Sequence, residues 1–94
     1  MTATALIAED EPLLAQEIRE ELARAWPELG ICAVTHDGHA ALRAVEACRP
    51  DVLFLDVELP GLNGLEVARL MGQRSHIVFI TAYDHYAVQA FEHG

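Results

Sequence analysis

The 94-residue sequence contains no lysine, and six arginines are its only basic residues against fifteen acidic ones. The resulting formal net charge of −9 excludes the basic face with which proteins grip nucleic-acid phosphates. Long apolar runs are absent too, since none approaches the roughly 20 residues of a membrane span. No basic, apolar leader precedes the acids at Glu9 and Asp10. The sequence therefore predicts a cytoplasmic domain that contacts neither nucleic acid nor membrane.

Cysteine is scarce, and Cys32 and Cys48 are the only two. Their spacing matches neither a metal-ligand nor a redox motif, and so apolar a chain does not need a disulfide scaffold. We expect two reduced thiols within the core. The composition, 52% hydrophobic and 22% charged, is that of one small globular domain.

Short apolar runs alternate with stretches of helical periodicity along the chain. The runs predict strands at residues 5–8, 31–34, 52–55 and 77–80. The segments between them predict a helix from Pro12 to about Ala25, one capped by Asp37, one capped by Asn63 with Glu66, and one capped by Asp84. Inner faces are expected at Ala41, Leu42, Val45 and Cys48 in the second helix and at Ala87, Val88 and Phe91 in the fourth, and the third helix carries Val67, Leu70 and Met71. The alternating order favours a parallel sheet with helices on both faces.

Polar side chains follow three of the predicted strands. Glu9 and Asp10 follow the first strand, Asp56 follows the third and Thr81 follows the fourth. If the first and third strands are neighbours, about 4.8 Å apart, the three acids share one pocket at the carboxyl ends of the strands. Oxygen ligands alone favour Mg²⁺, to which the backbone carbonyl of Glu58 adds a further donor. Solvated or helix-capping acids are the alternative interpretation for any one of these residues.

Three segments resemble the receiver domain of bacterial two-component response regulators: residues 7–12 (IAEDEP), 51–64 (DVLFLDVELPGLNG) and 79–82 (FITA). The resemblance covers the whole chain. Residues 81–91 further resemble the LytR/AlgR-type subgroup, whose members usually carry a LytTR DNA-binding domain after the receiver. This resemblance implies a flavodoxin-like (CheY-like) α/β fold with a parallel sheet of order 2-1-3-4.

The same resemblance implies a role for each matching residue. Asp56 matches the phospho-acceptor, which takes a phosphoryl group from a sensor histidine kinase, and Thr81 matches the switch hydroxyl that bonds this group. Glu9 and Asp10 match the acidic pair that organises Mg²⁺, and the Glu58 backbone matches the carbonyl ligand. Pro60 and Gly64 match the residues that shape the loop. The expected function is a non-enzymatic receiver that controls a downstream DNA-binding effector.

The sequence departs from the family at its end. A full receiver adds a fifth strand and helix, roughly 25 residues, and the fifth strand carries a phosphate-binding lysine. We therefore expect residues 1–94 to be a receiver truncated before its last strand and helix. An uncovered fourth strand favours a homodimer or higher assembly through the fourth strand and fourth helix.

Two other functions stay open. Without the lysine, the chain could be a non-phosphorylated module that only binds metal and dimerises. A phosphatase that uses Asp56 as nucleophile is the weaker reading, because dehalogenase-type sites place a second Asp where this chain has Glu58.

Overall fold

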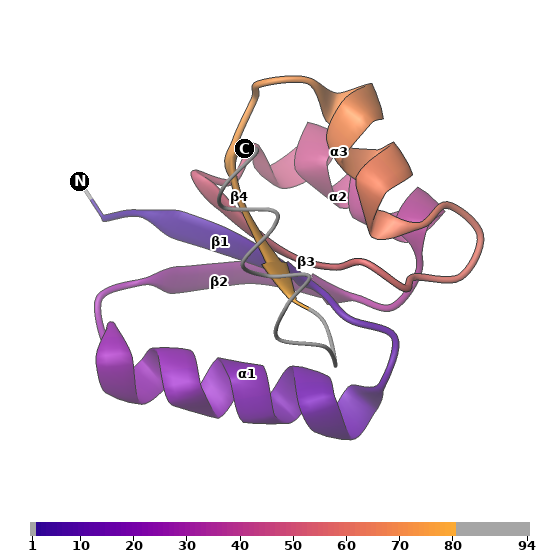
Figure 1. The fold of residues 1–94 in the computed structure, drawn as a ribbon. Coiled ribbons are helices and arrows are strands. Elements are labelled where there is room, and N and C mark those ends of the chain that lie inside the picture. Colours follow the sequence, from indigo (N-terminus) through magenta and orange to yellow (C-terminus); the bar gives the residue numbers. More distant parts are fainter. Residues whose placement is uncertain (1, 81–94) are drawn as a thin grey trace.

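The computed structural model describes residues 2–80, and Figure 1 shows their course. Four strands alternate with three helices, in the order predicted from the sequence. The bounds are β1 Thr4–Ala8, α1 Pro12–Ala25, β2 Gly30–Thr35, α2 Gly38–Cys48, β3 Val52–Asp56, α3 Gly64–Met71 and β4 His76–Ile80. The predicted fourth helix, with Asp84, Ala87, Val88 and Phe91, lies outside the described residues.

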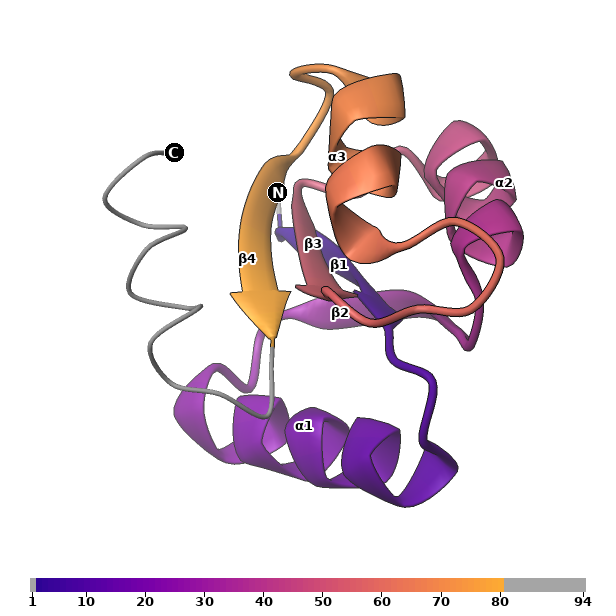
Figure 2. The ribbon, with the colours of Figure 1, turned by 45° about the vertical axis from the view of Figure 1, so that its right-hand side comes forward.

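The strands form one parallel sheet of order β2-β1-β3-β4, which confirms the predicted α/β fold. Helix α1 covers one face of the sheet, and α2 and α3 lie together on the other (Figure 2). Because the strands are parallel, all four end at the same edge of the sheet. No helix in the described part of the chain is long and apolar enough to cross a membrane.

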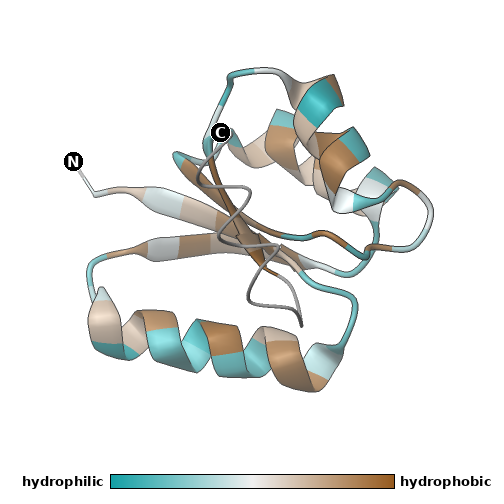
Figure 3. Cartoon of the chain, in the orientation of Figure 1, coloured by the Kyte–Doolittle hydropathy of each residue, from teal (hydrophilic) through white to brown (hydrophobic). Residues whose placement is uncertain are grey.

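The core lies between the two central strands and the pair α2 and α3. Its buried members are Leu6, Ala8, Ala41, Val45, Leu53, Leu55, Leu59, Val67 and Met71. Strands β3 and β4 are largely brown in the hydropathy view, whereas α1 alternates brown with teal (Figure 3). Consistent with that pattern, Ala15 is the one residue of α1 that is fully buried.

Two of the predicted helix caps, Asp37 and the pair Asn63 and Glu66, are present, and Asp84 lies outside the described residues. The Ala40 N–H donates to Asp37 Oδ1 at 2.7 Å. Asn63 and Glu66 form a reciprocal capping box, with backbone N–H to side-chain oxygen distances of 2.9 and 3.1 Å. These bonds satisfy backbone donors that have no partner within the first helical turn. They also define where the chain leaves the loops that follow β2 and β3.

Of the apolar residues in α3, Val67 and Met71 are buried, Ala68 packs against the core and Leu70 is 54% exposed. One burial prediction was wrong. Cys32 was expected in the core, yet it is exposed, and Cys48 is half-buried. Cys32 lies at a bulge in β2, where it has no partner on β1.

Candidate functional site

Two acids meet at the carboxyl ends of the central strands. Glu9 directly follows β1, and Asp56 is the last residue of β3. The register pairs Ala8 with Leu55, so Glu9 and Asp56 stand next to each other across the β1–β3 ladder. Both are buried, with exposures of 2% and 8%. Two buried carboxylates side by side are uncommon unless partners or protons compensate their charge.

Backbone bonds hold Glu9 from both sides. Its N–H donates to the Thr35 carbonyl at 2.9 Å, and its own carbonyl accepts from His36 Nδ1 at 2.8 Å. The Glu11 N–H donates to Glu9 Oε2, also at 2.9 Å. Strand β2 and the turn before α1 thus fix both the main chain and the carboxylate of Glu9.

Burial raises the pKa of Glu9 to about 7, from an ordinary value of 4.5. The neighbouring charge of Asp56 and the side-chain contact with it add to the increase, as does the charge of Glu11. The hydrogen bond from the Glu11 N–H opposes it. Desolvation and a like charge both penalise the ionised form, so the site favours a proton or a cation at neutral pH.

A tight loop holds Asp56. The Glu58 N–H donates to Asp56 Oδ1 at 2.9 Å, although the Glu58 side chain is exposed. The Gly64 N–H donates to the Val57 carbonyl at 2.9 Å. A Cβ on Gly64 would lie 2.2 Å from the Asp56 carbonyl oxygen, closer than any side chain allows. Glycine at position 64 therefore lets α3 begin directly against the backbone of Asp56.

A second glycine secures the other end of this loop. The Gly38 N–H donates to the Pro60 carbonyl at 3.1 Å, and a Cβ on Gly38 would lie 2.1 Å from the Leu62 carbonyl oxygen. Sequence reasoning singled out Pro60 and Gly64 here but missed Gly38 and His36. Their roles come from segments distant in sequence, so no local pattern reveals them.

The structure brings together two of the three predicted acids. Asp10 is exposed, and among residues 2–80 no three His, Cys, Asp or Glu side chains gather as a metal site. The donors at hand are all oxygens, which is the chemistry that Mg²⁺ prefers. The unrelieved charge of Glu9 and Asp56 fits a divalent cation with water as its remaining ligands. Thr81 lies outside the described residues.

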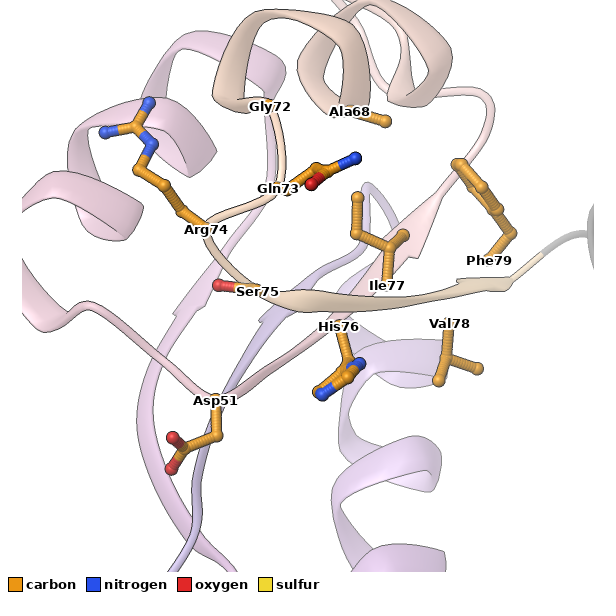
Figure 4. Close-up of a pocket in the computed structure, with 10 residues that line it drawn as sticks. All are labelled: Asp51, Ala68, Gly72, Gln73, Arg74, Ser75, His76, Ile77, Val78 and Phe79. Atoms are coloured by element: carbon orange, nitrogen blue, oxygen red, sulfur yellow. The ribbon is translucent and has the colours of Figure 1, made fainter.

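A cavity in the described part of the chain lies away from the acidic site. It has a volume of about 880 Å³ and runs along β4 and the segment after α3 (Figure 4). Ile77 and Phe79 point to the α3 side of the sheet, and His76 and Val78 point to the opposite side. The residues that line the cavity are Asp51, Ala68, Gly72, Gln73, Arg74, Ser75, His76, Ile77, Val78 and Phe79. Ile77, Val78 and Phe79 form an apolar edge along β4, and the cavity there is separate from the acidic site.

An open parallel sheet with a buried acidic pair at its carboxyl edge defines a class of α/β ligand-binding domains. The chain matches the family model of the response regulator receiver domain over residues 5–94. It therefore belongs to that family, whose members are non-enzymatic signal receivers of two-component systems.

Relatives and solved structures agree with this assignment. The chain is 50% identical over 94 residues to an uncharacterized response regulatory protein of Vibrio cholerae, covering 97% of this chain and 36% of that protein. It is 40% identical over 89 residues to the transcriptional regulatory protein BtsR of Salmonella typhi, covering 93% and 37%. The chain thus spans little more than a third of the length of these relatives.

The fold is similar to the REC domain of AraT, a response regulator from Geobacillus stearothermophilus. That comparison has a TM-score of 0.84 at 32% identity and covers 98% of this chain and 75% of that one. A two-component response regulator of the LuxR family from Aurantimonas has a TM-score of 0.81 at 27% identity, with coverage of 100% and 70%. Both TM-scores indicate that these structures share the fold of this chain.

Proposed function

We propose that Asp56 accepts a phosphoryl group from a phosphohistidine of a sensor histidine kinase. The observation that carries the proposal is the buried pair of Glu9 and Asp56 at the carboxyl ends of β1 and β3. Membership of the receiver family supports it. A carboxylate in this position can act as a nucleophile once nearby negative charge is neutralised.

The residues that would hold Mg²⁺ are Glu9, Asp10, Asp56 and the backbone carbonyl of Glu58. When bound, the metal supplies neutralisation of charge on the carboxylate and phosphoryl oxygens. Glu9 is too deeply buried to relieve its own charge through water, and it has a raised pKa. Asp10 is exposed and directly follows Glu9 in the chain. Both facts fit an acidic pair that is completed by a cation.

In the transfer, an Asp56 carboxylate oxygen forms a bond to phosphorus as the P–N bond to the kinase imidazole breaks. The electron pair of that bond returns to the imidazole, whose other ring nitrogen carries a proton, so the histidine leaves as neutral imidazole. The Glu58 N–H already donates to Asp56 Oδ1 at 2.9 Å and so orients the carboxylate. Thr81 is the proposed hydroxyl that bonds the phosphoryl group afterwards.

The wider protein is also part of the proposal. Residues 1–94 are proposed as a receiver short of its last strand and helix, in front of a LytTR DNA-binding domain. The relatives are nearly three times longer than this chain, and one of them, BtsR, is a transcriptional regulatory protein. Both observations support that arrangement. The apolar edge at β4 supports assembly through the fourth strand and fourth helix as a homodimer or larger. Sedimentation over a range of concentrations tests this: a mass that stays monomeric at every concentration contradicts it.

The phosphoryl transfer is tested by intact mass after incubation with acetyl phosphate and Mg²⁺. The expected result is one phosphoryl adduct, which is lost in the Asp56→Asn variant and is retained in Asp51→Asn, whose exposed acid lies at the opposite end of β3. No adduct on the folded wild-type chain contradicts the proposal. If that chain still binds Mg²⁺ and self-associates, the non-phosphorylated metal-binding and dimerisation module replaces it.

A further inference from the structure

The two cysteines belong to neighbouring elements at the amino ends of the strands. Cys48 is the last residue of α2, and Cys32 is the third residue of β2. Helix α2 packs against β1 and β2. Hydrogen bonds tie both chain segments to the start of β1: the Gly30 N–H donates to Ala3 and the Asp51 N–H to Thr4, at 3.0 and 2.9 Å. These two hydrogen bonds therefore attach the segments next to Cys32 and Cys48 to the same end of β1.

Strand β2 has a bulge at Cys32. Ala5 pairs with Ile31 and Leu6 pairs with Ala33, so Cys32 is an extra residue with no partner on β1. Ala33 packs against the core on the α2 side of the sheet. In an unbroken strand, Cys32 would point to the opposite face, toward α1. An inserted residue breaks this alternation and re-aims the side chain.

The thiol environment is consistent with that placement. Residue 32 as a whole is exposed, but desolvation of its thiol raises the pKa of Cys32 to about 11, and contact with the Cys48 thiol adds to the increase. The Cys48 thiol thus lies close enough to Cys32 to affect its ionisation. Both cysteines are free in the structure, and Cys32 is the more exposed of the two. A small reagent reaches Cys32 first, with Cys48 beside it.

We propose that Cys32 and Cys48 form a dithiol site that small disulfides oxidise reversibly to an intramolecular disulfide. The Cys32 thiolate attacks one sulfur of the small disulfide RSSR, forms a mixed disulfide and releases one thiolate. The Cys48 thiolate then attacks the Cys32 sulfur, forms the Cys32–Cys48 bond and releases the second thiolate. Two electrons pass from the protein to RSSR, and the two protein protons end on two RSH molecules. The site lies at the end of the sheet opposite to Asp56, so it does not depend on the proposed phosphoryl transfer.

The test is exposure of the 94-residue chain to oxidised glutathione, followed by intact mass and by alkylation after denaturation. The expected product is a monomer that has lost two hydrogen atoms, has no alkylatable thiol and is restored by dithiothreitol. Because the thiolate is the attacking species, the rate of oxidation by glutathione rises about tenfold per pH unit between pH 7 and pH 9. A rate that does not change with pH contradicts the assigned mechanism.

The two single variants serve as matched controls. Cys48→Ser is expected to stop at a persistent glutathione adduct on Cys32, and Cys32→Ser to react several-fold more slowly because Cys48 is half-buried. Cys48→Ala repeats the first control if the serine variant does not fold. A stable glutathione adduct on the wild-type chain, or a disulfide-linked dimer as its main product, would overturn the proposal.

Discussion

Replacing Glu9 with glutamine removes the most strongly perturbed carboxyl group of the acidic site. The glutamine has nearly the same shape and keeps an oxygen that can accept from the Glu11 N–H. It removes the charge beside Asp56. The change therefore isolates the electrostatic cost of Glu9 from its packing.

The raised pKa of Glu9 sets the magnitude and the sign of the expected change in the free energy of unfolding with pH. Below pH 4.5 the carboxyl is protonated in both the folded and the unfolded chain. Between pH 4.5 and about 7 the unfolded chain releases this proton while the folded chain keeps it. The free energy of unfolding therefore falls as the pH rises through this window, by about 1.4 kcal/mol per pH unit. The loss in the free energy of unfolding totals about 3 kcal/mol and is complete above pH 7.

Urea denaturation without divalent cations, at pH 5 and at pH 8, measures the effect. Glu9→Gln is expected to be about as stable as the wild type at pH 5 and more stable by about 3 kcal/mol at pH 8. Glu17→Gln, an exposed acid on α1, is the control and should follow the wild type at both pH values. The reasoning is refuted if Glu9→Gln and wild type keep the same difference in free energy at both pH values.

Three further outcomes are expected. Mg²⁺ at pH 8 should raise the Tm of the wild type and have less effect on Asp56→Asn; equal shifts in both proteins would place the cation elsewhere. Gly64→Ala should cost about 1–3 kcal/mol by urea denaturation, because its Cβ meets the Asp56 carbonyl, whereas Gly30→Ala, with its nearest contact at 3.8 Å, should change stability by less than about 0.5 kcal/mol. Met71→Ala should cost about 2–5 kcal/mol and Leu70→Ala far less; similar losses would contradict the rotation assigned to α3.

Elements whose signals are local were predictable from the sequence. The cap at Asp37 and the capping box at Asn63 and Glu66 lie within three residues of the backbone groups that they satisfy. The strands were predictable because buried parallel strands are short and apolar throughout. The proximity of Glu9 and Asp56 followed once the first and third strands were taken as neighbours.

Features that depend on distant segments were not predictable. The contact between Gly38 and Leu62, and the bond from His36 to Glu9, join segments that no periodicity links. The bulge at Cys32 is also invisible in the sequence, because it appears only in the register against β1. For that reason the sequence suggested two buried thiols and gave no sign that the Cys48 thiol affects the pKa of Cys32.

The unequal cover of the two sheet faces has a consequence for native-state hydrogen exchange. Helix α1 buries one residue fully, whereas α2 and α3 each bury three. Local opening of a helix costs less where it releases less buried surface, so exchange from α1 should precede exchange from α2 and α3. The amides of β1 and β3, whose side chains pack from both faces, should exchange only on global unfolding. The acidic site would thus keep its strand-borne residues in the most protected part of residues 2–80, next to the least protected of the three helices described there.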